Sequence, residues 1–151
     1  MKRISIILLM IFFTWLYGYA QNDADRILGK WISSEGNLIV EVFKESNYFK
    51  AKLVWFNDSD NKNKPMNERL DENNKNKSLR SRKVIGMEIL QNLVYDRKQN
   101  RWEDGMIYDS QSGKEWNSSI WLENTNLLKV RGFWHFEFIG KTMSFKPFKK
   151  N

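Results

Sequence analysis

Along most of this chain, short apolar runs alternate with turn signals at intervals of roughly 8 to 12 residues, the spacing of an all-β sandwich or barrel. An amphipathic helix would repeat its apolar residues every three or four positions, and that periodicity is nearly absent. In one run, Phe49, Ala51 and Leu53 fall on one face of a predicted strand, while Lys50 and Lys52 fall on the other. The pattern restricts the chain to an all-β fold.

The alternation predicts strands over residues 38–43, 48–56, 86–95, 101 or 102 to 108, 114–122, 127–136 and 138–145. Polar turns separate them, and Gly113 can supply the positive φ of a tight turn. About eight consecutive antiparallel strands in so short a chain favour a meander that closes into a barrel, because closure removes exposed strand edges. One polar loop, residues 57–83, interrupts the pattern, with a short helical turn expected at 78–82.

The long loop begins with Asp58-Ser59-Asp60, which is how a calcium-binding loop could start. The rest of such a motif is missing. Lys62 stands where a third oxygen ligand is needed, Asn63 where glycine is needed, and Arg69 where a bidentate glutamate is needed. We therefore expect a solvated loop and no metal site.

Residues 1–20 have the composition of a secretory signal peptide. A basic start, Met1-Lys2-Arg3, precedes an uncharged apolar run, and Gly18 and Ala20 are small residues at the positions that signal peptidase reads. Cleavage after Ala20 would leave residues 21–151 as a single domain without a transmembrane span, in the periplasm or secreted from a bacterium. An uncleaved anchor is the alternative, because residues 4–20 just reach spanning length.

Residue usage removes several classes of chemistry. The chain has no cysteine, which excludes disulfides, thiolate metal sites and a cysteine nucleophile. A single histidine, His135, excludes sites with several histidine ligands and leaves a serine triad only if this histidine is its base. We therefore expect neither a cofactor nor a metal.

The formal net charge is +7, and loss of Lys2 and Arg3 would leave about +5. Anionic lipid or an acidic envelope polymer could meet such a surface, whereas export argues against nucleic acid as a partner. Most basic residues are interspersed with acids, which is typical of a solvated mixed surface. The exception is the terminal group Lys146, Lys149 and Lys150.

Several segments together resemble the small exported bacterial proteins catalogued as domain of unknown function 2147. Their residues are Gly29-Lys30-Trp31, Leu79-Arg80-Ser81-Arg82, Gly86-Met87-Glu88-Ile89-Leu90, Trp102-Glu103-Asp104-Gly105-Met106-Ile107-Tyr108-Asp109, Gly113-Lys114 and Leu128-Lys129-Val130-Arg131-Gly132-Phe133. The chain departs from the family pattern at Lys83, Ser110 and Lys141, where the family usually has proline, proline and arginine.

The resemblance implies a lipocalin-like β-barrel and an exported protein, with no established activity. Gly29-Lys30-Trp31 also resembles the Gly-x-Trp of lipocalins, whose Trp closes one end of the barrel under a basic side chain. Arg131 is the expected partner of Trp31, through a cation–π contact. Structural roles are expected for Gly29, Trp31, Gly86, Trp102, Gly105, Gly113 and Gly132.

The candidate ligand-binding residues are Glu88, Tyr108, Asp109 and Arg131. If Glu88 points inward it needs a partner such as Arg131 or Arg80, because a buried carboxylate is costly when unpaired. Asp109 could equally accept backbone hydrogen bonds in its own turn. Arg131 could brace the fold instead of touching a ligand.

Three functions remain open. The first is a non-enzymatic binding module that holds a small apolar or amphipathic ligand inside the barrel. The second is a surface interaction protein that binds anionic lipid or envelope polymer through basic loops. The third is a hydrolase or isomerase using Glu88, Tyr108, Asp109 or His135, although no recognisable nucleophile and base accompany them.

Cleavage of the leader is directly testable. We expect mass spectrometry of the exported protein to find Gln21, unmodified or cyclised, as the first residue, because signal peptidase reads Gly18 and Ala20. A full-length product embedded in the membrane would contradict the assignment.

Overall fold

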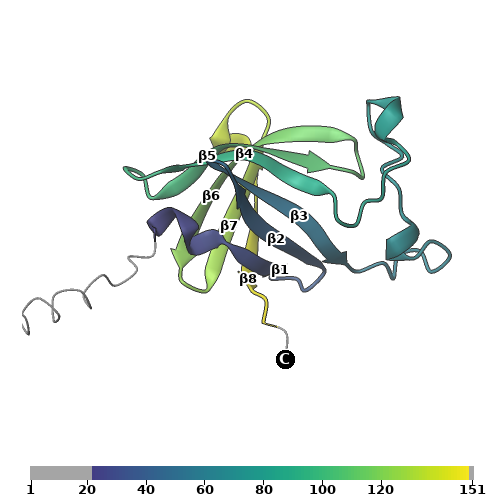
Figure 1. The fold of residues 1–151 in the computed structure, drawn as a ribbon, viewed down its shortest axis with the longest axis horizontal. Helices are drawn as coiled ribbons and strands as arrows, with labels where there is room; N and C mark the ends of the chain where they lie inside the picture. The colour runs from purple at the N-terminus through teal and green to yellow at the C-terminus, as the bar shows by residue number, and fades with distance from the viewer. Residues whose placement is uncertain (1–21, 150–151) are drawn as a thin grey trace, which may run out of the picture.

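The computed structural model describes residues 22–149, which form a closed barrel of eight antiparallel strands, each paired with its neighbours along the chain (Figure 1). The strands are β1 (Gly29–Ser33), β2 (Leu38–Glu45), β3 (Tyr48–Phe56), β4 (Glu88–Asp96), β5 (Arg101–Asp109), β6 (Lys114–Asn124), β7 (Leu127–Phe133) and β8 (Lys141–Pro147). Pairing of β1 with β8 closes the barrel. The expected antiparallel meander is thus confirmed, and the predicted leader lies outside the described residues.

Four short 3₁₀ helices accompany the strands within residues 22–149: η2 (Asp23–Ile27), η3 (Met66–Glu68), η4 (Lys77–Leu79) and η5 (Glu137–Ile139). The turn expected at 78–82 corresponds to η4, which begins one residue earlier. The strand predicted over 127–136 is too long, because β7 ends at Phe133. Alternating apolar residues continue past that point, but η5 and its flanking residues form a connection instead of strand.

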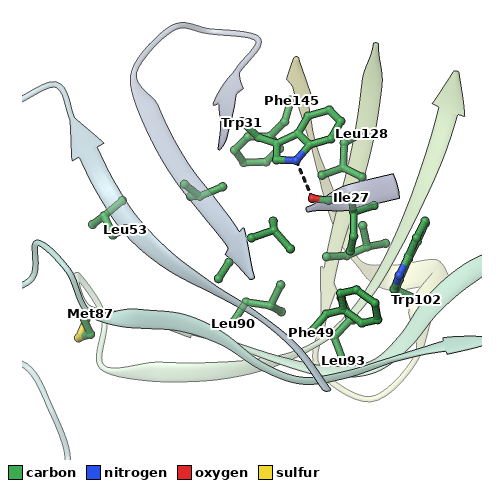
Figure 2. Close-up of a cluster of buried hydrophobic side chains, with 14 of the residues drawn as sticks. Ile27, Trp31, Phe49, Leu53, Met87, Leu90, Leu93, Trp102, Leu128 and Phe145 are labelled. Atoms are coloured by element: carbon green, nitrogen blue, oxygen red, sulfur yellow. Dashed lines mark hydrogen bonds between the residues drawn. The ribbon is translucent and has the colours of Figure 1, made fainter. Parts of the chain in front are cut away.

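The helix η2 closes one end of the barrel. Ile27 is fully buried, and its carbonyl accepts a hydrogen bond of 2.8 Å from the indole Nε1 of Trp31 (Figure 2). The indole of Trp102, also fully buried, donates through Nε1 to the carbonyl of Ala24 at 3.0 Å. Because a buried carbonyl without a partner is costly, these two bonds let a short polar backbone segment enter an apolar interior.

Apolar side chains fill the interior around this closure. Their packed members include Phe49, Leu53, Leu90, Leu93, Leu128 and Phe145, which converge from different strands in Figure 2. Gly105 allows the sheet to pack closely here: a Cβ at this position would lie 2.4 Å from Ser118 Oγ and 2.6 Å from Leu93 Cδ1. The structural role expected for Gly105 therefore has a steric cause.

The expected contact between Trp31 and Arg131 is wrong. Trp31 points into the barrel, whereas Arg131 shares its pairing position with Ser119 and Thr142 and alternates with the inward residues of β7. At the closed end a basic side chain does lie over a tryptophan, but the pair is Arg26 and Trp102, with 5.9 Å between the guanidinium carbon and the ring centroid. Because successive side chains of a strand point to opposite faces, Arg131 points outward when Val130 and Gly132 face the interior.

Replacing the indole donor tests the closure. We expect Trp102→Phe to lower the free energy of unfolding by about 2–4 kcal/mol, because the Ala24 carbonyl loses its partner and the core loses volume. Urea unfolding measures the change. Trp134→Phe is the control, since Trp134 is exposed and should change stability by less than about 0.5 kcal/mol. Equal effects of both substitutions would contradict the role of the indole.

Candidate functional site

The lumen is not filled evenly, and a pocket of about 840 Å³ lies at the end of β5–β8 remote from η2. Inward residues of the four strands form its wall. Paired positions show how: Ile107 faces Trp116 across β5 and β6, and Val130 faces Met143 across β7 and β8. The lining surface is mainly apolar. Its size and character suit a small ligand with a long apolar part.

Gly132 makes room at the centre of this wall. It pairs with the buried Ser118 on one side and with Lys141 on the other. The nearest atoms to a Cβ built at Gly132 would be Trp116 Cβ at 3.8 Å and Ile107 Cδ1 at 3.9 Å, which is ordinary contact. A side chain longer than alanine would extend into the pocket.

The connection between β7 and β8, residues 134–140, forms the rim of the pocket. Arg131 holds it from the outer face of the sheet: Nε donates to the Glu137 carbonyl at 2.5 Å, and Nη1 donates to Thr142 Oγ1 at 2.8 Å. Asn117 Nδ2 donates to the Trp134 carbonyl at 2.8 Å. Arg131 therefore braces the rim, whereas the sequence predicted that it would brace Trp31 at the closed end.

Polar groups at the pocket are few. Asp109 accepts hydrogen bonds from the Gln111 backbone at 3.0 Å and from Ser112 Oγ at 2.6 Å, so its carboxylate serves its own turn. His135 lies at the rim beside Trp134, with 5.7 Å between ring centroids. Within residues 22–149, the ammonium group of Lys141 takes part in no ion pair, so it is the cation that faces the pocket unpaired.

A second, smaller hollow of about 340 Å³ lies outside the barrel, between β4–β6 and the long loop. Glu88 and Tyr108 line it, together with Arg82 of the loop. Glu88 pairs with Lys50 at 3.5 Å and is partly exposed, so the expectation of an inward Glu88 paired with Arg131 or Arg80 is wrong. The register that places Glu88 opposite Lys52 turns it outward with the other charged residues of the sheet.

The fully buried Asp71 holds the long loop against the barrel. Its carboxylate accepts from Tyr108 Oη at 2.6 Å, from Asn74 Nδ2 at 2.7 Å and from Arg82 Nε at 2.8 Å. Burial and the hydrogen bond to Asp71 raise the pKa of Tyr108 to about 12, so the phenol is a proton donor at neutral pH. The loop is therefore anchored, where the sequence predicted a solvated segment.

Gly113 completes this attachment. Its φ is 65°, as expected for its turn, and a Cβ would lie 2.0 Å from the Asn73 carbonyl oxygen of the long loop. Asn73 Nδ2 in turn donates to the Gln111 carbonyl at 2.8 Å. Only glycine permits both the backbone conformation and the close approach.

The residues selected from the sequence therefore fall into separate places. Glu88 and Tyr108 face the outer hollow, Asp109 lines the apolar pocket, and Arg131 braces its rim. Sequence reasoning missed Lys141 and the central position of Asp71. The run Trp134-His135-Phe136-Glu137-Phe138-Ile139 held no signal for the rim, because Trp134, Phe136 and Phe138 continue an alternating pattern beyond the end of β7.

Two further observations concern the described part of the chain. Among residues 22–149, no group of three or more histidine, aspartate or glutamate side chains is arranged to hold a metal ion. No helix in the same range is long and apolar enough to cross a membrane.

Comparisons with known proteins agree with this architecture. Residues 29–146 match the sequence model of a family described as "Uncharacterized protein conserved in bacteria (DUF2147)". The fold is similar to a solved structure described as "Protein HP1028 from the human pathogen Helicobacter pylori belongs to the lipocalin family", with a TM-score of 0.67 and 20% identity over 82% of this chain and 84% of that one. At this identity the likeness concerns the fold. Among curated proteins, none matches the sequence.

The Asp71 anchor gives a pH-dependent prediction. We expect Tyr108→Phe to lower the free energy of unfolding by about 1–3 kcal/mol at pH 7, because a buried carboxylate loses a donor. The folded-state pKa of Tyr108 is raised, so the stability it provides is complete below about pH 10 and is lost as the pH rises toward 12. Urea unfolding of both proteins across pH 7–11.5 should therefore show their difference shrinking above pH 10.

The control for this experiment is Tyr48→Phe, which alters an exposed tyrosine near the other end of the barrel. Its stability should follow that of the unaltered protein at every pH. A constant difference between Tyr108→Phe and the unaltered protein across this range would contradict the linkage.

Proposed function

This chain belongs to the bacterial DUF2147 family and has a lipocalin-like barrel, and on that basis we propose that it is an exported protein that binds a small amphipathic ligand without chemical conversion. The observation that carries the proposal is the apolar pocket of about 840 Å³ at the open end of the barrel. Barrels of eight strands can hold one small ligand when side chains leave part of the lumen free.

The polar groups of the pocket indicate the charge of the ligand's head group. Lys141 pairs with Gly132 on the wall of the pocket, and its ammonium group is free of ion pairs within residues 22–149. His135 adds a second nitrogen donor at the rim. Because Asp109 is engaged in its own turn, the balance favours an anionic head group such as a carboxylate. The ligand we propose is a fatty acid or a similar anionic amphiphile.

Binding of an anionic polymer through basic loops is less well supported. The long loop mixes eight basic residues with five acidic ones, and three of the basic residues form ion pairs: Lys64 with Glu72 at 2.6 Å, Arg69 with Asp60 at 2.6 Å, and Arg82 with Asp71 at 2.8 Å. Each pair reduces the positive charge that the loop presents outward.

The predicted leader, if cleaved as expected, places the binding domain of residues 21–151 outside the cytoplasm.

A pair of substitutions at Gly132 tests the pocket. Gly132→Phe places a phenyl ring beside Trp116 and Ile107, in the space that the ligand would occupy. We therefore expect this substitution to raise the Kd for dodecanoate or palmitate at least about tenfold. Gly132→Ala is the matched control, since its methyl group fits and should leave the Kd nearly unchanged. Tryptophan fluorescence reports binding, because Trp116 and Trp134 line the pocket.

The head group is tested separately with the same assay. Lys141→Met should weaken dodecanoate binding about tenfold while leaving dodecanol binding unchanged, because only the carboxylate is expected to meet the ammonium group. The proposal fails if no amphiphile changes the emission, or if Gly132→Phe binds as tightly as Gly132→Ala.

A further inference from the structure

The rim of the pocket concentrates exposed apolar side chains. Trp134 is 53% exposed, Phe136 60%, Phe138 78% and Ile139 71%, all within six consecutive residues. Elsewhere in residues 22–149, the exposed large apolar residues outside the pocket are single and less exposed: Leu28, Tyr48, Leu79 and Val94 at 37–46%. Single exposed apolar residues are ordinary, but a contiguous patch of this kind marks a surface of interaction.

The structure holds these side chains outward. Ile139 N donates to the Phe136 carbonyl at 3.1 Å, and Gly140 N donates to the Glu137 carbonyl at 3.0 Å. The rings of Phe136 and Phe138 stack at 5.6 Å. The backbone of Gly140 packs tightly against β7, because a Cβ at this position would lie only 2.6 Å from the Gly132 carbonyl oxygen. The connection therefore presents its apolar residues from a fixed backbone, anchored also by Arg131.

The size of the patch distinguishes between partners. From the exposed fractions, its accessible area is on the order of 500 Å². A specific protein partner usually covers about 800 Å² on each side, so the patch is small for that purpose. A loop of tryptophan, phenylalanine and isoleucine is instead suited to the boundary between head groups and acyl chains of a bilayer.

Charge around the patch favours an anionic surface. Glu137, the acidic residue of the connection, forms an ion pair with Arg101. Arg131 and Lys141 flank the connection, and within residues 22–149 neither side chain pairs with a carboxylate. The apolar rim is thus bordered by uncompensated positive charge, which anionic head groups would complement.

We propose that the connection of residues 134–140 inserts into the surface of an anionic lipid bilayer and places the mouth of the pocket against it. The ligand's source is then the bilayer, a statement that rests on the proposed function. Docking itself depends only on the rim. Trp134, Phe136 and Ile139 belong to both the patch and the pocket lining, so an amphiphile leaving the bilayer would meet continuous apolar surface.

The experiment measures binding of the mature chain to vesicles of phosphatidylcholine with and without 30% phosphatidylglycerol, by co-sedimentation. We expect binding to the anionic vesicles, and we expect Phe138→Ser to reduce the partition coefficient about tenfold or more. Phe138 is the most exposed of the four residues and does not line the ligand pocket. Tyr48→Ser, an exposed aromatic removed at a distant turn, is the matched control and should bind as the unaltered protein does.

Solution binding of dodecanoate separates the two proposals. Phe138→Ser should keep the Kd for dodecanoate while losing vesicle binding, which supports docking through the rim. Equal vesicle binding by Phe138→Ser and the unaltered protein, or no binding of the unaltered protein to anionic vesicles, overturns it. Self-association that Phe138→Ser abolishes, without vesicle binding, also overturns it and assigns the patch to contact between copies. Vesicle binding without dodecanoate binding contradicts the proposed function and leaves docking through the rim supported.

Discussion

Two indole hydrogen bonds at the closed end support the rest of the barrel. Trp31 and Trp102 each donate to a carbonyl of η2, which lets this backbone segment occupy the apolar interior with its exposed acceptors satisfied. Around it, buried side chains from all eight strands form the apolar core. At the opposite end, the buried polar groups belong to the long loop, where the hydrogen bonds of Asp71 satisfy them.

The two ends consequently have different character. On the β5–β8 side of the open end, the small Gly132 and the half-buried Val130 leave the pocket unfilled. In the core at the closed end, larger side chains fill the corresponding space. The long loop between β3 and β4 lies against the end of β5 and is anchored there by the buried carboxylate of Asp71, with Tyr108 and Arg82 as partners. A polar network thus fixes the loop on one side, and an apolar rim borders the pocket on the other. This asymmetry leaves the apolar pocket open on one side of the barrel.

Several elements could be predicted from local pattern. Strands β2, β3, β5 and β6 follow alternation, and their bounds agree closely with expectation. The end of β7 could not be predicted, because residues after Phe133 remain apolar and alternation gives no stop signal there. The connection is set instead by long-range contacts, such as that of Arg131 with the Glu137 carbonyl. Likewise, the cation–π pair expected of Trp31 and Arg131 is formed by Trp102 and Arg26 instead, since sequence order does not say which basic side chain lies over which tryptophan.

By itself, the sequence determined the all-β class, the antiparallel order of the strands and the family resemblance. Period-two alternation and turn residues act between near neighbours, which is why they can be read along the chain. Only the tertiary structure decided which polar residues meet. Asp71 and Tyr108 lie 37 residues apart, and Trp102 and Ala24 lie 78 apart, yet each pair forms a hydrogen bond. Closure of the barrel brings such residues together, and this depends on packing of the whole chain, which no local pattern encodes.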